Sequence, residues 1–484
     1  MKIKYLKNRT IITPYFNNKV LIISLLISVL CYTVYVLFRG FGWDGDSFIS
    51  AAQYQTLIGS DLYGIFEGGA HPKILSVLLF GIVYKLSGGF YFLTILSIAL
   101  NTLMIATIVS WIYREDGLWL IALFGLLINI PWTKIVVNCD NPAFSIPFII
   151  FGLFFYSKKS NVFAALFLTI SSLFRSGAEF IILILLLNQI FNKSPKNVII
   201  FGLAFVVSAI NTYWGYLLIY PTKELFWELT WKSLRTPEII AEYQYSLNAF
   251  ILYIKSIIIQ IFNKYNILFI IPCIIGIIKL FRKQNSIKFI LLTPLASLIS
   301  PIGSFIYGNY HDCYETKHMG YTILLPVLAA FSINSSIFEK VGSKTKNFIT
   351  SGILLLVILF YAFIGNLKTG EYEAHVNGTG VIGWTNFPDI KHDIKAIFPS
   401  EKINILTAHQ YLTFTTLDIG KYAYNIDIIY NVTEFNYPGA NKYDLIIIPN
   451  TWDVNSTRMS SLGYLFNSNS NNSYIYYIYN PVQF

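Results

Sequence analysis

Charged residues are scarce in this chain. Asp, Glu, Lys and Arg make up 12% of its 484 residues, whereas soluble domains carry roughly 25%. This shortage excludes a soluble multidomain enzyme, and the high apolar content without a short repeat excludes disordered and fibrous proteins. The four cysteines are too few for a disulfide scaffold. Cys139 and Cys313 could pair with each other if both face outward, although unpaired thiols are the simpler interpretation.

Sequence motifs for common soluble chemistry are also missing. The chain has no Walker A motif, no Rossmann glycine fingerprint and no G-x-S-x-G elbow. We therefore do not expect ATP hydrolysis within this chain, and any activated group must arrive ready-made.

Apolar residues dominate instead. They account for 55% of the chain, and its mean hydropathy is +0.56. Several apolar runs reach or exceed the ~20 residues of a helix that crosses a bilayer. The sequence therefore predicts an α-helical polytopic membrane protein with about 11 transmembrane helices. Their expected ranges are roughly 20–38, 90–112, 117–133, 142–157, 161–175, 177–191, 197–219, 265–281, 288–306, 319–337 and 347–365.

The apolar segment 74–86 decides the predicted topology. It has only about 13 residues, a length that suits an interfacial or re-entrant helix better than a span. If it lies on the outer surface, the inner side receives 17 of the 28 Lys and Arg of residues 1–366, but only three of their 15 carboxylates. This distribution agrees with the positive-inside rule and predicts a cytoplasmic N-terminus. Counting 74–86 as a span would reverse every later loop.

The net charge of +10 separates into two parts along the chain. Residues 1–366 contain 28 Lys and Arg against 15 Asp and Glu, a net charge of +13, whereas residues 367–484 contain 7 against 10, a net charge of −3. The positive excess thus indicates cytoplasmic loops and no nucleic-acid partner. We predict a transmembrane domain at 1–366 and an extracytoplasmic α/β domain at 367–484, with strand-like runs at 403–408, 443–449 and 474–479.

The first outer loop carries two carboxylates, Asp44 and Asp46, with Trp43 beside them. Carboxylates two residues apart at a low-dielectric surface could share a metal ion or act as a general base with a raised pKa. A solvated turn is the alternative, because Asp and Gly favour turns. His71 and Lys73 close the loop, where they could face a phosphate or anchor the following short helix.

Two further outer stretches carry candidate residues. Asp140 comes just before the predicted span 142–157, where it either caps the helix or serves chemistry. The stretch 220–264 interleaves apolar and charged residues as an interfacial helix does. Its Lys232 and Arg235 could reach a substrate phosphate or contact lipid headgroups.

Another outer junction contains Arg175 and Glu179. An (i, i+4) spacing puts two residues on one helix face, so these two side chains could pair.

The stretch 307–318 is dense in polar residues, which are His311, Asp312, Glu315, Lys317 and His318. Such density at the end of a span marks function more often than a plain connector. The two histidines are seven residues apart, and no H-E-x-x-H spacing occurs. Phosphate or sugar binding is therefore favoured over a metal site here.

The order of these features resembles that of GT-C-type glycosyltransferases, polytopic enzymes that take sugars from polyprenyl-phosphate carriers. The resemblance covers residues 1–365 and rests on the order of short stretches: W-D-G-D-S-F at 43–48, G-S-D-L-Y-G at 59–64, H-P-K-I-L at 71–75, Asp140, and K-H-M-G-Y-T-I-L-L-P at 317–326. The family often has His-Pro-Pro where this chain has a lysine after His-Pro, so the subfamily stays open.

The resemblance implies that the transmembrane domain is catalytic and transfers a sugar, with inversion, to an extracytoplasmic glycan, lipid or protein. Asp46 would be the catalytic residue, and Asp44 and Asp140 would orient the acceptor or hold a divalent cation; no other cofactor is implied. Residues expected to bind the donor phosphate are Arg235, Lys232, Lys317 and Arg175. Residues expected to contact substrate are His71, Lys73, His311, His318 and Trp43.

Other functions stay open. A transporter or flippase of lipid-linked glycans would show charged residues within the spans and internal repeats, and the chain shows few such charges and no clear repeat. A polymerase of lipid-linked glycans would also use the outer loops. A receptor built around the C-terminal domain would bind without turnover.

Overall fold

The structure is a computed structural model, and it is mostly helical. It describes residues 18–39, 54, 73–87, 91–175, 177–219, 247–261, 267–283, 286–297, 323–333, 342, 345, 351–352, 355–357, 359–360, 403–408, 423–429, 435, 442–449, 454–467 and 474–479. The chain forms two compact units. The helical unit contains residues 1–41, 90–212 and 240–367, and the sheet unit contains residues 42–89, 213–239 and 368–484.

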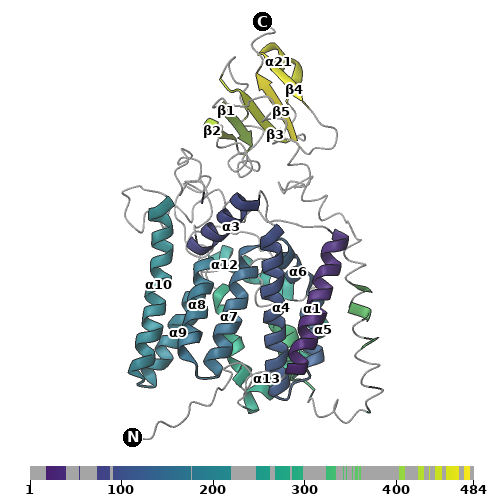
Figure 1. Cartoon of the computed structure of the whole chain (residues 1–484), viewed down its shortest axis with the longest axis vertical. Coiled ribbons are helices and arrows are strands. Elements are labelled where there is room, and N and C mark those ends of the chain that lie inside the picture. Colours follow the sequence, from purple (N-terminus) through teal and green to yellow (C-terminus); the bar gives the residue numbers. More distant parts are fainter. Residues whose placement is uncertain are drawn as a thin grey trace. The chain divides into compact units, whose positions relative to one another are not determined.

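The helical unit is a bundle whose long helices stand side by side (Figure 1). Helices α1, α4, α7, α8 and α9 pack in this order, each against the next. The bounds are α1 Asn18–Arg39, α4 Tyr91–Arg114, α5 Trp119–Leu127, α6 Ile130–Val137, α7 Asn141–Ser157, α8 Asn161–Phe174, α9 Ala178–Phe191, α10 Pro195–Ile219, α12 Leu247–Ile261, α13 Ile267–Lys283, the 3₁₀ helix η3 Ser286–Ser297 and α15 Leu324–Ala329.

The outer faces of these helices are apolar. Large side chains such as Leu26 of α1, Leu203 of α10 and Ile271 of α13 are more than 60% exposed. Two helices, Lys19–Leu37 and Tyr91–Arg114, are long and apolar enough to cross a membrane, and several described helices are shorter but also apolar. A bundle with apolar residues on both its inner and outer faces differs from a soluble domain, whose exposed helix faces are polar.

Several helices lie where the sequence predicts apolar spans. Helices α7, α8, α9 and α10 each begin and end within two residues of a predicted range. The predicted span 117–133 is different, because two short helices, α5 and α6, occupy it. Asn129 separates them and accepts a hydrogen bond from the Trp132 amide, with Pro131 in the first turn of α6. An N-cap amide and an early proline start a new helix.

Helix α12 is another departure. The sequence assigns 220–264 to an outer loop, yet Leu247–Ile261 forms a regular helix. Its apolar residues recur at helical spacing over these 15 residues. The expected interfacial helix around Lys232 and Arg235 lies outside the described residues.

Four helices end in the same kind of turn. In each, a residue other than glycine adopts a left-handed backbone, and the next N–H bonds to the carbonyl five residues back, as in a Schellman turn. The left-handed residues are Asp116 (φ 61°), Cys139 (φ 57°), Lys159 (φ 59°) and Lys193 (φ 52°). The matching bonds are Gly117 to Ile112 (3.0 Å), Asp140 to Ile135 (3.2 Å), Ser160 to Phe155 (3.0 Å) and Ser194 to Gln189 (3.1 Å).

The sheet unit contains a five-stranded sheet in the order β2-β1-β3-β5-β4 (Figure 1). Strand β1 runs parallel to β2 and β3, whereas β5 runs antiparallel to β3 and β4. The bounds are β1 Ile403–Ala408, β2 Ala423–Ile429, β3 Leu445–Pro449, α21 Ser456–Ser461, β4 Tyr464–Asn467 and β5 Tyr474–Tyr479. Strands β1, β3 and β5 lie in the three strand-like runs of the sequence.

One face of this sheet has a compact apolar core. Leu406, Ile446, Ile448, Met459 and Tyr464 are buried together there. Because the parallel strands carry near-continuous apolar residues, such as I-N-I-L in β1 and L-I-I-I in β3, they suit the interior of a mixed sheet.

Helix α3, Ile74–Ser87, also belongs to the sheet unit. Its 14 residues are apolar and too few to cross a bilayer. This length matches the short helix expected at 74–86.

Candidate functional site

The structure describes three of the residues that the sequence nominates for the site: Lys73, Asp140 and Arg175. The others lie outside the described residues, and their roles stay predictions. They are Trp43, Asp44, Asp46, His71, Lys232, Arg235, His311, Lys317 and His318.

Lys73 precedes α3 in the sheet unit and is only 5% exposed. Its carbonyl accepts a hydrogen bond of 2.8 Å from the Val77 amide and so begins the first turn of α3. Lysine is rarely buried unless it is paired. The carbonyl bond of Lys73 fits the anchoring role that the sequence allowed, and contact with a phosphate stays a prediction.

Asp140 occupies the N-cap position of α7 and is 6% exposed. Its extended backbone (φ −66°, ψ 148°) is typical of an N-cap, and its carbonyl accepts the first helical bond, from Ala143, at 2.8 Å. Its carboxylate, however, makes no capping hydrogen bond. The structure thus places Asp140 at the cap position that the sequence allowed, without a side-chain capping hydrogen bond, and its role in chemistry stays a prediction.

Helix α4 holds the connection that carries Asp140. Thr94 Oγ1 lies 2.9 Å from Cys139 Sγ, and Ser97 Oγ donates to the Val136 carbonyl at 2.7 Å. Residues 94, 97 and 101 share one face of α4, because they are spaced by three and four. This face therefore contacts and hydrogen-bonds residues 136–143, which we call the Asp140 connection.

The third member of this face is Asn101, which is fully buried. Its amide Nδ2 donates to the carbonyl of Ala143 at 2.8 Å. In a regular helix that carbonyl would bond to the N–H of residue 147, but Pro147 has no N–H. The side chain of Asn101 thus supplies the donor that the proline of α7 removes.

Arg175 lies at the same end of the bundle as Asp140. Helices α7 and α8 are antiparallel neighbours, and Phe144 near the start of α7 stacks on Phe174 at the end of α8, with ring centroids 5.4 Å apart. Ser145 Oγ and Ser171 Oγ, 2.8 Å apart, join the same two helix ends. Arg175 is the half-buried residue that directly follows α8.

The expected shared helix face of Arg175 and Glu179 is wrong. Arg175 has an extended backbone after the end of α8, and Gly177, at φ 127°, separates it from α9. Glu179 lies in the first turn of α9, where its carboxylate accepts a hydrogen bond from the Gly177 N–H. A carboxylate in a first turn also interacts favourably with the helix dipole.

Gly177 could not be another residue. A Cβ built there would lie 2.0 Å from the carbonyl oxygen of Ala296 in η3. Its backbone torsion is also one that L-residues rarely adopt. This close approach brings the end of η3 to the same junction as Arg175.

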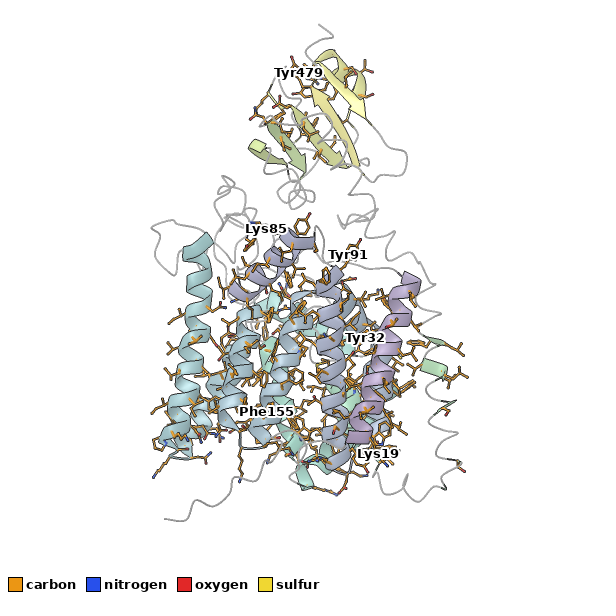
Figure 2. All side chains as sticks on the ribbon, viewed as in Figure 1. Lys19, Tyr32, Lys85, Tyr91, Phe155 and Tyr479 are labelled. Carbon is orange, nitrogen blue, oxygen red and sulfur yellow. The ribbon has the colours of Figure 1, made fainter. Side chains whose placement is uncertain are left out.

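Figure 2 shows the two ends of the helical unit, with Tyr91 at one and Lys19 and Phe155 at the other. The Tyr91 end carries the Asp140 connection, because Thr94 contacts Cys139. We call this end of the bundle the Asp140 end. The described acidic and basic residues at this end include Asp140, Arg175, Glu179 and Lys134 of α6.

A metal site was expected, if anywhere, at Asp44, Asp46 and Asp140. Within the described residues, no three His, Cys, Asp or Glu side chains lie close enough together to hold a metal ion. Asp140 is the described member of that carboxylate set, so the cation stays a prediction. Cys139 is a buried thiol beside Thr94, in line with the simpler interpretation of the cysteines, and Cys313, its possible partner, lies outside the described residues.

Sequence reasoning missed Thr94, Ser97 and Asn101. Their signal is present in the sequence, since three polar residues at helical spacing interrupt an apolar span, and polar groups within spans are costly unless they have partners. The internal proline of α7 is the complementary signal.

Comparison with protein-family models and with curated proteins finds no match to this chain.

Proposed function

We propose that this chain is an integral membrane glycosyltransferase of the GT-C type, which moves a sugar from a polyprenyl-phosphate carrier to an extracytoplasmic acceptor. The observation that carries the proposal is the buried carboxylate of Asp140 at the start of α7, at the same end of the bundle as Arg175. A carboxylate can orient or deprotonate an acceptor hydroxyl, and a guanidinium can stabilise a phosphate leaving group. The order in which the short sequence stretches containing Asp46 and His71 occur along the chain supports the same assignment.

The surface of the bundle supports a membrane location. Exposed leucine, isoleucine and phenylalanine side chains on α1, α4, α9, α10 and α13 would contact lipid tails. We propose about 11 spans, with residues 1–366 as the catalytic membrane domain and 367–484 as an extracytoplasmic domain that binds the acceptor. The Asp140 end would face outward and the N-terminus would be cytoplasmic.

The proposed step is one displacement at the anomeric carbon. The acceptor oxygen attacks that carbon, and Asp46 accepts the proton of the acceptor hydroxyl. The bond from the anomeric carbon to the phosphate oxygen breaks, and polyprenyl phosphate leaves with the electron pair. Arg175, with Lys232, Arg235 or Lys317, neutralises that phosphate. A single displacement inverts the configuration of the sugar.

A transporter or flippase is the alternative. Such a protein needs charged groups along its path through the membrane. In the described part of the chain, the buried charged residues are Lys73 and Asp140, and both lie at the end of a helix. The buried polar side chains within the described helices are hydroxyl and amide groups, which favours the transferase.

The test is an assay with the purified protein in detergent. It is incubated with a polyprenyl-phosphate sugar, and the release of polyprenyl phosphate and the transfer of sugar are measured. Asp46→Asn should abolish release, and Asp140→Asn should reduce it. Asp116→Asn is the matched control, because Asp116 is an exposed carboxylate at the opposite end and should leave turnover unchanged.

Two results would reject parts of this proposal. Full turnover by Asp46→Asn at normal expression would remove Asp46 from the chemistry. Carrier movement across vesicles without any cleavage of the sugar phosphate would favour the flippase. Repeating the assay with a chelator tests the divalent cation at Asp44, Asp46 and Asp140, since loss of turnover that Mg²⁺ or Mn²⁺ restores would support it.

A further inference from the structure

The end of the helical unit opposite Asp140 gathers connections from five parts of the chain. The carboxylate of Glu115, after α4, accepts hydrogen bonds from the Ser286 amide (3.2 Å) and from Ser286 Oγ at the start of η3. Leu118 N–H donates to the Ala330 carbonyl after α15 at 2.8 Å.

Helices α7 and α9 end at the same place. Asn188 and Gln189 of α9 donate to the hydroxyl of Tyr156 at 2.6 and 2.9 Å. The ring of Tyr156 meets that of Phe289 in η3, with centroids 4.9 Å apart. The ends of α4, α7, α9 and α15 and the start of η3 therefore lie together at this end of the helical unit.

The surface of this end is strongly basic. The basic residues that it gathers, which we call the basic surface, are Lys19, Arg114, Lys158, Lys159, Lys193, Lys196, Lys279, Arg282 and Lys288. The described acidic residues at this end are Glu115 and Asp116. Since Glu115 is engaged by Ser286, its charge is partly committed within the fold. The surface therefore presents a net positive charge.

Two of these lysines occupy left-handed backbone positions, at which glycine is the favoured residue. Lys159 and Lys193 are the left-handed residues of the turns after α7 and α9. Glycine is the usual residue there, because a Cβ is disfavoured in that conformation. Both side chains are exposed, so internal packing does not explain them. Their charge is what distinguishes them from glycine.

Lys158 contacts an aromatic ring and lies close to other charged residues. Its Nζ lies 5.7 Å from the centroid of the Phe154 ring, and the side chain is half-buried. Burial lowers the pKa of Lys158, Arg114 lowers it further, and Glu115 opposes both. A second cation–aromatic contact joins Lys288 to Phe289 at 5.9 Å. The rings stabilise these cations in place, and a nearby anion would offset the repulsion between neighbouring cations.

We propose that the basic surface binds the headgroups of anionic phospholipids, with Lys159 and Lys193 as two of the contacting residues. This rests on the membrane location under Proposed function but not on the transferase activity. Phospholipid is the fitting occupant because apolar helix faces lead directly to these lysines, as in Phe191 (81% exposed) near Lys193. Each lysine or arginine near an anionic membrane surface contributes about 1 kcal/mol of attraction to it.

The test counts lipids bound to the full chain. The protein is purified in a neutral detergent, phosphatidylglycerol or phosphatidylcholine is added, and bound lipid is measured by native mass spectrometry. The wild type should bind phosphatidylglycerol in preference to phosphatidylcholine. The double variant Lys159→Gly/Lys193→Gly should bind phosphatidylglycerol about 30-fold more weakly, from about fivefold for each lysine.

Asp116→Gly is the matched control. It relieves a left-handed residue at the same end but removes a negative charge, so phosphatidylglycerol binding should be unchanged or tighter. Thermal unfolding in detergent without lipid should show all three glycine substitutions as neutral or stabilising. If the glycine double variant does not fold, Lys159→Gln/Lys193→Gln removes the charges with normal side chains and should show the same loss.

Two outcomes would overturn the proposal. One is equal phosphatidylglycerol binding by wild type and both double variants. The other is complete displacement of the lipid by inorganic phosphate at matching concentration, which would assign the surface to free phosphate. Neither of these lipid-binding measurements depends on sugar transfer. Failure of the transferase proposal and failure of the lipid-binding proposal can therefore be told apart.

Discussion

Replacement of Asn101 by leucine tests whether a side chain of α4 compensates for the proline of α7. Asn101 Nδ2 donates to the Ala143 carbonyl at 2.8 Å, and Pro147 cannot donate to it. Leucine has the same branching pattern and is somewhat larger, so the substitution removes the donor without leaving a cavity. The Ala143 carbonyl would then be buried without a donor.

The expected change in the free energy of unfolding combines a loss at the Ala143 carbonyl with a smaller gain from removing the Asn101 carbonyl oxygen. Hydrogen bonds between membrane helices contribute about 0.6 kcal/mol on average and up to about 1.7, and an unsatisfied buried carbonyl costs about 1–3 kcal/mol. The substitution also removes Asn101 Oδ1, a buried acceptor with no hydrogen-bond donor in the described structure, which returns part of the loss. We expect a net loss of about 1–2 kcal/mol.

A double-mutant cycle isolates the compensation. In a Pro147→Ala background, residue 147 regains its N–H and can bond to the Ala143 carbonyl. Asn101→Leu should then cost less than about 0.5 kcal/mol, giving a coupling of at least about 0.5 kcal/mol. The free energy of unfolding is measured by titrating the detergent-solubilised protein with sodium dodecyl sulfate.

Asn211→Leu provides the control. Asn211 is also buried, also has an unpartnered Oδ1 within the described structure, and donates to the Ser172 carbonyl at 3.2 Å. Because Asn211 bonds to the Ser172 carbonyl and not to that of Ala143, its loss does not depend on the N–H of residue 147 and should add to that of Pro147→Ala. An Asn101→Leu cost that is the same in both backgrounds would refute the compensation.

Two further predictions concern other parts of the fold. Gly177→Ala should destabilise the helical unit by about 3 kcal/mol or more, because its Cβ would meet the Ala296 carbonyl. Gly202→Ala in open space on α10 should stabilise it by up to about 1 kcal/mol, and equal effects in thermal unfolding would contradict the packing. In the sheet unit, burial raises the pKa of Tyr464, helped by Asp444 and opposed by the hydrogen bond from Tyr443 N–H. Stability should therefore be unaffected below about pH 10 and fall above it, as the unfolded chain ionises first, and Tyr464→Phe should lessen that fall in a pH series of unfolding free energies.

The positions of many elements follow from local sequence. Helices α7 to α9 are bounded where apolar runs meet short polar turns, such as the two lysines after Ser157, and β1, β3 and β5 lie in apolar runs flanked by polar residues. These boundaries depend on nearest neighbours along the chain. A single sequence therefore suffices to predict them.

The contacts of the site do not follow in this way. The sequence could place Asp140 before a helix, but it does not predict that its carboxylate makes no capping bond or that the preceding Cys139 is left-handed and contacts Thr94. The shared helix face expected for Arg175 and Glu179 was wrong because α8 ends at Phe174 and α9 begins after Gly177, so the two residues do not belong to one helix. Both outcomes are set by neighbouring helices, which spacing along the chain does not specify.

Helix α4 links the two functional proposals. Its first turns bond the Asp140 connection through Thr94, Ser97 and Asn101, and at its other end Trp111 Nε1 donates to Ser286 Oγ at 2.9 Å beside the basic surface. Rotating α4 by one residue, about 100°, would break both sets of bonds together. In an apolar interior each lost partner is costly, because no water replaces it. The polar residues of α4 therefore select one rotational setting from those that its apolar surface would accept, and the placement of both ends depends on that setting.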